Sequence, residues 1–172
     1  MELPEHGRLG LYGFGSSAHV VLALARHLGH EVHVVTREAQ HRALAARLGA
    51  ASVAEADGRP PVPLDGAIVF APAGEVVEAA LRAVGPGGTV VTAGITMTPI
   101  PSLDYQACLF HERQLRSVEA NTREDGRELL AAAAAARFVP EVTRFPLQEA
   151  NEALRALRED RVAGTAVLDL AL

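Results

Sequence analysis

Short apolar runs alternate with longer amphipathic segments through most of the chain. The runs are rich in valine, leucine and isoleucine, which favours strands that are buried on both faces of a sheet. We predict strands at residues 9–12, 31–36, 51–54, 66–72, 89–95 and 115–120. The segments between them predict helices at 16–29 and 38–49, a helix and a glycine-proline turn within 75–88, a short helix within 101–114, and a helix at 122–138.

Strands and helices that alternate at this spacing are typical of right-handed crossovers and a parallel sheet. We therefore predict an α/β protein with a doubly wound, six-stranded parallel sheet over residues 7–137. After Phe138 the rhythm changes, and residues 138–172 predict a strand-helix-strand extension outside the six-strand count. Gly29 is expected to end the first long helix, and Asn121 or Thr122 to begin the last helix of the sheet domain.

Composition removes several classes of function. A formal charge of −5 disfavours a nucleic-acid partner, and no apolar run is long enough to span a membrane. The N-terminal residues lack the apolar core of a secretory signal, and a single cysteine fits a reducing compartment, so we expect a cytoplasmic protein. All 16 basic residues are arginines, so a phosphate-loop lysine, a Schiff-base lysine and a Tyr-x-x-x-Lys dyad are excluded.

The stretch GFGSSA, Gly13 to Ala18, matches G-x-G-x-x-G/A between a predicted strand and a predicted helix. In this fingerprint the first glycine permits a tight turn, and the second lets the backbone approach a pyrophosphate. The amides of Ser16 and Ser17 would open the helix, where its positive end favours an anion. The alternative is a glycine turn that binds nothing.

The end of the second predicted strand indicates which nucleotide would fit. An acid about 20 residues after the glycines usually binds the adenosine ribose of NAD, and Thr36 lies 21 residues beyond Gly15. Thr36 and Arg37 instead offer a hydroxyl and a guanidinium, which suit a 2′-phosphate. We therefore favour NADP over NAD and disfavour a methyltransferase, unless Arg37 merely begins a solvated helix.

Small residues stand at the ends of the fourth and fifth predicted strands. Ala71, Ala73, Ala93 and Gly94 would let a flat ring lie against the backbone, although small residues also simply make tight turns.

Other reactive side chains are given structural interpretations. His30 lies in a Gly-His-Glu stretch without a nearby cysteine, so a metal role is disfavoured, and Cys108 is expected to be a buried small hydrophobe. His111 and Glu112 could be acid-base groups, but polar residues entering a strand are the favoured interpretation.

The chain resembles the cofactor-binding half of zinc-type alcohol dehydrogenases in the medium-chain dehydrogenase/reductase superfamily. The resemblance rests on LGLYGFGSSAH, HVVTRE, LDGAIVFAPAGE, GGTVVTAGI and LFHERQLRSVEANTR, and on the ending FPLQEANEALRALREDRVAGTAVLDL. It implies a Rossmann domain whose cofactor-binding residues are Gly13, Phe14, Gly15, Ser16, Ser17, Thr36, Arg37, Ala71, Pro72, Ala93, Gly94, Ile95 and Asn121.

Members of this family are about twice as long, and an additional N-terminal domain supplies the zinc ligands and the proton relay. The resemblance therefore implies no catalytic residue and no metal ligand in this chain, and little turnover by the chain alone. Residues from about 138 onward would pack on that catalytic domain. The chain would then be a fragment, a separately expressed domain or a natural short relative. The alternative is a stand-alone nucleotide-binding module or sensor that dimerises through its C-terminal segment.

Overall fold

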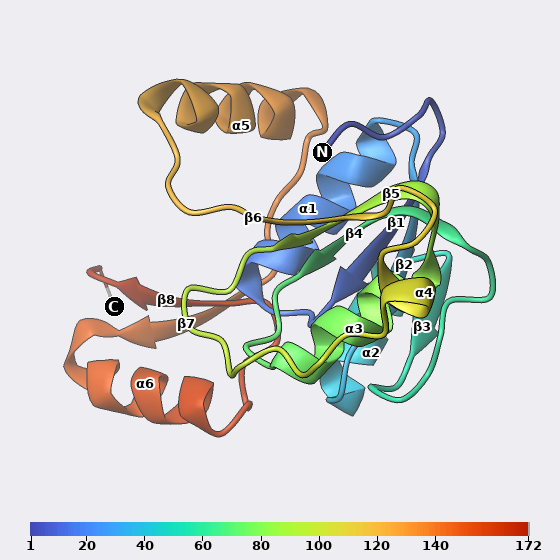
Figure 1. Ribbon diagram of the computed structural model, residues 1–172. Coiled ribbons are helices and arrows are strands. Elements are labelled where there is room, and N and C mark those ends of the chain that lie inside the picture. The colour runs from blue at the N-terminus through green and yellow to red at the C-terminus, as the bar shows by residue number, and fades with distance from the viewer. Residues whose placement is uncertain (172) are drawn as a thin grey trace.

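A twisted parallel sheet forms the centre of the molecule (Figure 1), and the computed structural model describes residues 1–171. Its strands are β1 (Arg8–Tyr12), β2 (Glu31–Val35), β3 (Ser52–Ala54), β4 (Leu64–Val69), β5 (Val84–Thr92) and β6 (Gln114–Ser117). They pair in the order β3-β2-β1-β4-β5-β6, and every pairing is parallel. This order reverses direction between β1 and β4, as in a doubly wound sheet. The predicted fold class is confirmed.

Helices cover both faces of this sheet (Figure 1). The helices between strands are α1 (Ser16–His27), α2 (Ala39–Arg47), α3 (Gly74–Ala83) and the short α4 (Tyr105–Cys108). On one face α1 and α2 pack on Leu9, Leu11, Val32 and Val34, and on the other α3 and α4 pack on alternate strand positions such as Tyr12. Because strand side chains alternate between faces, one sheet supplies both cores. Burial of a large apolar side chain stabilises the fold by roughly 1.5–3 kcal/mol.

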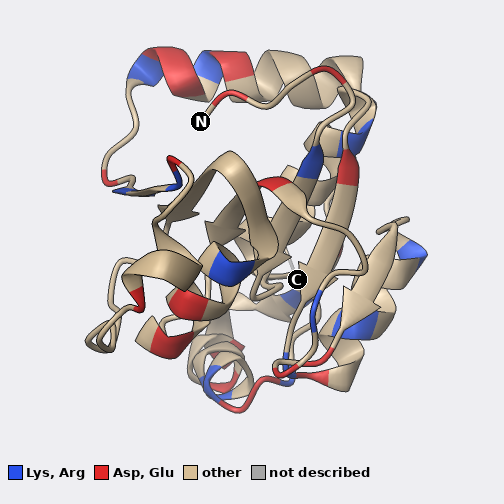
Figure 2. Ribbon diagram, turned by 45° about the vertical axis from the view of Figure 1, so that its right-hand side comes forward, with Lys and Arg blue, Asp and Glu red and all other residues tan. Residues whose placement is uncertain are grey.

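Helix ends follow the predicted caps. Gly29 adopts φ +86° just after α1, in the left-handed conformation that glycine reaches without steric cost. Thr122, rather than Asn121, caps α5 (Arg123–Ala135), and its hydroxyl and the Asp125 carboxylate form a reciprocal capping box. Charged residues occupy the first half of α5 and alanines the second (Figure 2), and none of its residues is buried.

Several strand bounds differ from the sequence prediction. β4 ends at Val69 rather than at 72, and β6 ends at Ser117 rather than at 120. β5 begins at Val84 rather than at 89, because Val84 pairs with Leu64 before a register shift. Arg113 Nε also donates a hydrogen bond to the Val84 carbonyl at 2.9 Å. His111 and Glu112 lie in a turn with φ of 69° and 62° that leads into β6 at Gln114, which agrees with their interpretation as polar residues entering a strand. The Gly87 amide donates to the His111 carbonyl at 2.8 Å, which ties this turn to the early part of β5.

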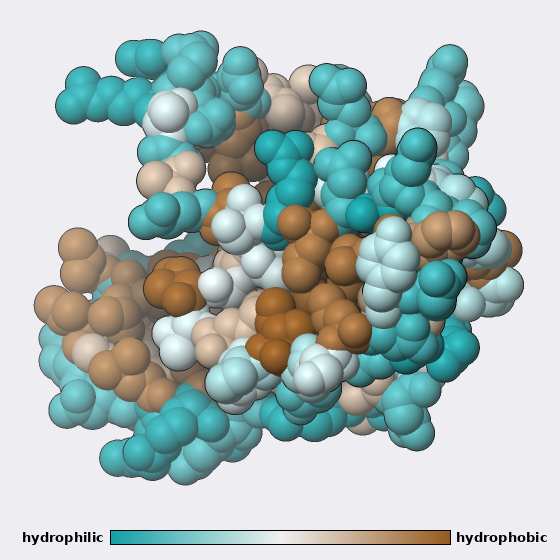
Figure 3. Space-filling view, viewed as in Figure 1, coloured by the Kyte–Doolittle hydropathy of each residue, from teal (hydrophilic) through white to brown (hydrophobic). Residues whose placement is uncertain are grey.

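The C-terminal segment forms a separate small layer. β7 (Val142–Pro146) and β8 (Thr165–Asp169) pair in parallel, and a 3-10 turn (Leu147–Glu149) and α6 (Ala150–Arg158) connect them. Hydrophobic residues gather over β7 and β8 at the left of Figure 3. The exposed large apolar residues of the segment are Val139, Val142, Leu147, Leu154, Leu157, Val167, Leu168 and Leu170.

Cys108 is fully buried in the core beside α3, as the sequence predicted, and burial raises the pKa of its thiol. Over the described residues, the structure has no helix with the length and hydrophobicity of a membrane span.

Candidate functional site

A cleft of about 820 Å³ opens where β1, β2, β4 and β5 end. In a parallel sheet the carboxyl ends of these strands meet at one edge, and at a reversal of strand order the loops diverge and leave a crevice. The lining residues are Gly13, Phe14, Gly15, Ser16, Ser17, Ala18, Val35, Thr36, Arg37, Glu38, His41, Ala56, Phe70, Ala71, Pro72, Ala73, Glu75, Val76, Ala79, Ala93, Gly94, Ile95, Thr96 and Asp160.

The glycine turn fixes one wall of this cleft. Gly13 has φ +87°, and a Cβ added there would lie 2.8 Å from the amide nitrogen of Ala71. A Cβ added at Gly15, by contrast, would meet no atom within 4 Å. Ala18 is fully buried, so the start of α1 packs closely on the sheet. The turn therefore presents open space above Gly15 and the exposed first residues of α1.

The first amides of α1 face that space without a side-chain cap. Gly15 stands at the N-cap position and forms no capping hydrogen bond. The Ser16 hydroxyl instead lies 2.6 Å from the hydroxyl of Thr165 at the start of β8. Uncapped amides at the positive end of a helix suit an anion, so this part of the cleft can bind a phosphate group.

The end of β2 carries charged groups of both signs. Thr36 is buried, and Arg37 is largely exposed. Arg37 Nε donates to Glu38 at 2.5 Å, and Arg37 Nη2 lies 3.4 Å from a carboxylate oxygen of Asp160. Partial burial opposes ionisation of Glu38 and is the largest single effect, but the hydrogen bonds to its carboxylate and the charge of Arg37 together outweigh it, and the pKa of Glu38 is lowered. A ligand at this end would meet a guanidinium flanked by two carboxylates.

The loop after α6 closes this end of the cleft. Gln40 donates to the Asp160 carbonyl, and the His41 ring nitrogen lies 3.3 Å from the Val162 carbonyl oxygen. Together with the Ser16–Thr165 contact, these bonds dock the C-terminal segment on the rim of the cleft.

Twelve of the thirteen residues predicted to bind cofactor line this one cleft: Gly13, Phe14, Gly15, Ser16, Ser17, Thr36, Arg37, Ala71, Pro72, Ala93, Gly94 and Ile95. Asn121 does not; it lies exposed beyond the end of β6. Sequence reasoning missed Glu38, which directly follows Arg37. It also missed Asp160, because that residue reaches the cleft from the opposite end of the chain.

Comparison with known proteins identifies the family of this chain. Residues 18–135 match the family described as zinc-binding dehydrogenase. The chain belongs to this family. The resemblance to zinc-type alcohol dehydrogenases is thereby confirmed, and a probable alcohol dehydrogenase of Mycobacterium tuberculosis (strain CDC 1551 / Oshkosh), AdhA, is 52% identical over 167 residues. That match covers 97% of this chain and 48% of the relative, so this chain spans about half the length of that curated relative.

Solved dehydrogenase structures share the fold and differ in the nucleotide they contain. The protein CAD from Helicobacter pylori, complexed with NADP(H), matches with a TM-score of 0.81 at 17% identity, covering 98% of this chain and 49% of that one. Acetophenone reductase from Geotrichum candidum in complex with NAD matches with a TM-score of 0.82 at 20% identity, covering 97% of this chain and 49% of the reductase chain. Likeness of fold therefore does not choose between the two nucleotides.

Proposed function

We propose that this chain is the dinucleotide-binding half of a zinc-type alcohol dehydrogenase, and that it binds NADP(H) in preference to NAD(H). The observation that carries the proposal is the convergence of four strand ends and the Gly13–Ala18 turn on one cleft of about 820 Å³. The complete enzyme would transfer hydride between an alcohol or aldehyde and the nicotinamide.

The cleft fits a dinucleotide in both shape and donors. The space above Gly15, which a Cβ would fill without touching protein, leaves room for a pyrophosphate beside the amides of Ser16 and Ser17. The Ser16 hydroxyl would exchange its contact with Thr165 for a phosphate oxygen. Ala71, Ala93 and the residues beside them would flank the nicotinamide. When bound, the nicotinamide supplies the hydride chemistry, and the protein supplies position and shielding from water.

A zinc ion does not fit the residues of this chain. Among residues 1–171 no group of three or more histidine, cysteine or acidic side chains is placed to hold a metal. The zinc ligands and the proton relay would belong to another part of the enzyme. We expect the 172-residue chain assayed alone to bind nucleotide and to show little or no alcohol oxidation. Robust turnover by the purified chain without an added partner would overturn that expectation.

The preference for NADP(H) rests on Arg37. Its contact with Asp160 is long, and its side chain is largely exposed, so the guanidinium can exchange Asp160 for a 2′-phosphate. A phosphate carries up to two negative charges, against one on the carboxylate that it would replace. Glu38 supports the opposite preference, because its carboxylate could accept hydrogen bonds from the ribose hydroxyls of NAD.

Calorimetric titration with NADPH, NADH and S-adenosylmethionine distinguishes these possibilities. We expect NADPH to bind most tightly, and Arg37→Ala to weaken NADPH much more than NADH. Asp160→Asn, which removes the competing charge, should raise the affinity for NADPH and leave NADH nearly unchanged. If NADH binds as tightly as NADPH, Arg37→Ala affects neither and Glu38→Gln weakens NADH, the nucleotide is NAD and the preference proposed here is wrong.

A second candidate function is a stand-alone nucleotide-binding module that dimerises through the C-terminal segment. The exposed apolar residues on β7, α6 and β8 favour some partner surface, because a patch of this kind is usually covered. A second copy and a separate catalytic domain would both cover it. Sedimentation velocity at micromolar concentration separates them: a strict monomer removes the dimer, and a dimer that Leu154→Asp and Leu168→Asp dissociate supports it.

A further inference from the structure

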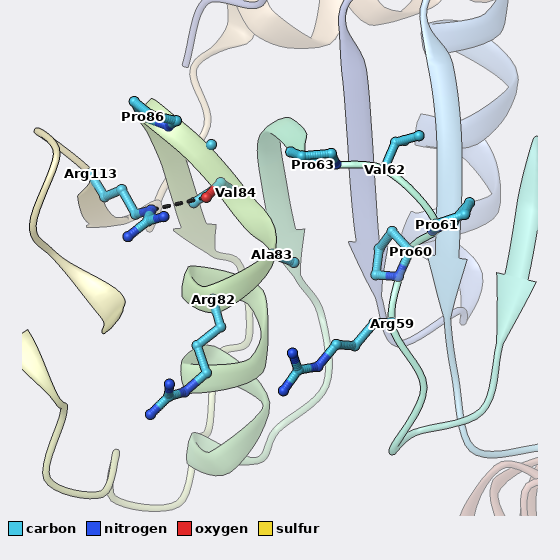
Figure 4. A pocket seen from close by; sticks show the side chains of 11 residues that line it. Arg59, Pro60, Pro61, Val62, Pro63, Arg82, Ala83, Val84, Pro86 and Arg113 are labelled. Carbon is cyan, nitrogen blue, oxygen red and sulfur yellow. Dashed lines mark hydrogen bonds between the residues drawn. The ribbon is translucent and has the colours of Figure 1, made fainter. Parts of the chain in front are cut away.

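A second cavity, of about 380 Å³, lies at the amino ends of β4 and β5, opposite the edge of the sheet that carries the cleft. The loop at residues 59–63 forms one side, and the end of α3 with the start of β5 forms the other (Figure 4). None of its lining residues lines the cleft. A ligand in this cavity would therefore leave the dinucleotide cleft open. The volume of the cavity falls within the usual range for small-molecule sites.

Three arginines line this cavity: Arg59, Arg82 and Arg113. In Figure 4 the Arg59 side chain extends from the loop toward α3, which carries Arg82. Within residues 1–171, Glu78 is the one carboxylate within 4 Å of any of these guanidiniums. The cluster therefore has a local net charge of about +2, in a chain whose formal charge is −5.

The three guanidiniums differ in how much of their hydrogen-bonding capacity is used. Arg82 donates Nε and Nη2 to Glu78, and Arg113 donates to backbone carbonyls, including Nε to Val84 at 2.9 Å. Arg59 forms no hydrogen bond or ion pair with any other residue in the described part of the chain. Because a guanidinium has five N–H donors, Arg59 has all of its donors available and Arg82 retains some.

Prolines build the rest of the wall. Pro60, Pro61, Pro63 and Pro86 all line the cavity, and Figure 4 shows three of them on the loop that carries Arg59. A proline ring fixes φ, so this loop loses little conformational freedom when a ligand binds. The ring faces are apolar and can contact the uncharged part of a ligand.

We propose that this cavity is a binding site for a small organic phosphate. A phosphate monoester presents three oxygens that several guanidiniums can share, and its charge of about −1.5 to −2 balances the net charge of the cluster. A carboxylate would neutralise only half of that charge. The proline walls favour an ester with an apolar or planar body over inorganic phosphate.

NMR titration of the full chain with phenyl phosphate and with inorganic phosphate tests the proposal. We expect saturable amide shifts at Arg59, Val62 and residues 82–85, with phenyl phosphate binding more tightly than inorganic phosphate. The same titration in the presence of saturating NADPH should give the same shifts, because the two sites are separate. Shifts confined to the Gly13–Ala18 turn, or no saturable shifts at millimolar ligand, would overturn the proposal.

Variants provide the decisive control. Arg59→Ala should weaken phenyl phosphate about tenfold or more, the equivalent of one charge-assisted hydrogen bond, without lowering the melting temperature, because Arg59 has no structural partner. Arg158→Ala removes the same charge from the exposed end of α6 and should leave the affinity unchanged. Equal weakening by both variants would mean nonspecific attraction to the surface and would also refute the site.

Discussion

Gly13→Ala tests whether the first glycine of the turn is required by backbone geometry. Gly13 has φ +87°, and in a left-handed conformation a residue with a Cβ costs roughly 1–2 kcal/mol. The new Cβ would also lie 2.8 Å from the Ala71 nitrogen and 3.2 Å from its Cα. That backbone cannot easily move, because the amides of Phe70 and Ala71 both donate to the Tyr12 carbonyl, at 2.8 and 3.1 Å.

The expected destabilisation follows from these two effects. Overpacking against a fixed neighbour costs about 1–3 kcal/mol, and the stiffer unfolded chain returns about 0.4–1 kcal/mol. We therefore expect Gly13→Ala to lower the free energy of unfolding by roughly 2–4 kcal/mol, which corresponds to a fall in melting temperature of about 5–15 °C for a chain of this size. Urea unfolding followed by circular dichroism is the suitable assay, since the chain contains no tryptophan.

Gly15→Ala is the matched control, with the opposite pattern. Its Cβ meets no protein atom within 4 Å, so stability should change by only about 0.5 kcal/mol, as the loss of a glycine N-cap and the stiffer unfolded chain roughly offset each other. Nucleotide affinity should fall sharply, because the same methyl group occupies the space assigned to the pyrophosphate. A Gly13→Ala variant as stable as the wild type, or a Gly15→Ala variant that binds nucleotide normally, would refute this account of the turn.

Three further substitutions probe other parts of the structure. Leu81→Ala removes a fully buried side chain from the core beneath α3 and should cost about 2–5 kcal/mol in urea unfolding, whereas the exposed Leu154→Ala should cost little. The Arg8 hydrogen bond holds the pKa of Asp65 below its usual value, so the stabilisation it gives is present above about pH 4 and is lost as pH falls through the lowered pKa. Asp65→Asn should thus be less stable than the wild type at pH 7. The difference in melting temperature between the two proteins should become smaller near pH 3, and a difference that stays constant with pH would contradict this reasoning. Thr122→Ala removes the capping box of α5 and should cost that helix about 1 kcal/mol, seen as faster hydrogen exchange at 126–135 with little change in global unfolding, because α5 buries no residue.

The sheet could be predicted because its signals are local. Apolar residues dominate β1, β2 and β4, and each strand is followed by a glycine or a turn; the alternation with helices leaves few topologies. The early start of β5 could not be predicted in this way. Val84 lies among glycines and a proline that indicate a turn, and its pairing depends on Leu64 and on Arg113, which lies 29 residues away.

In the cleft, too, only residues with a local sequence signal could be predicted. The glycine turn and the small residues after β4 and β5 could be located because each lies at the end of a predicted strand. Asp160 could not, since its contact with Arg37 joins residues 123 positions apart. Asn121 was assigned by resemblance alone, and the structure leaves it outside the cleft.

The Ser16–Thr165 contact has a consequence for the order in which the molecule is assembled. The two hydroxyls lie 149 positions apart, so the glycine turn leaves the ribosome long before the residue that completes its rim. Pairings this distant close late and slow folding. A nascent chain should therefore form β1, α1 and β2 with an open phosphate turn, and the rim of the cleft should be completed only once the C-terminal layer has been synthesised and has docked.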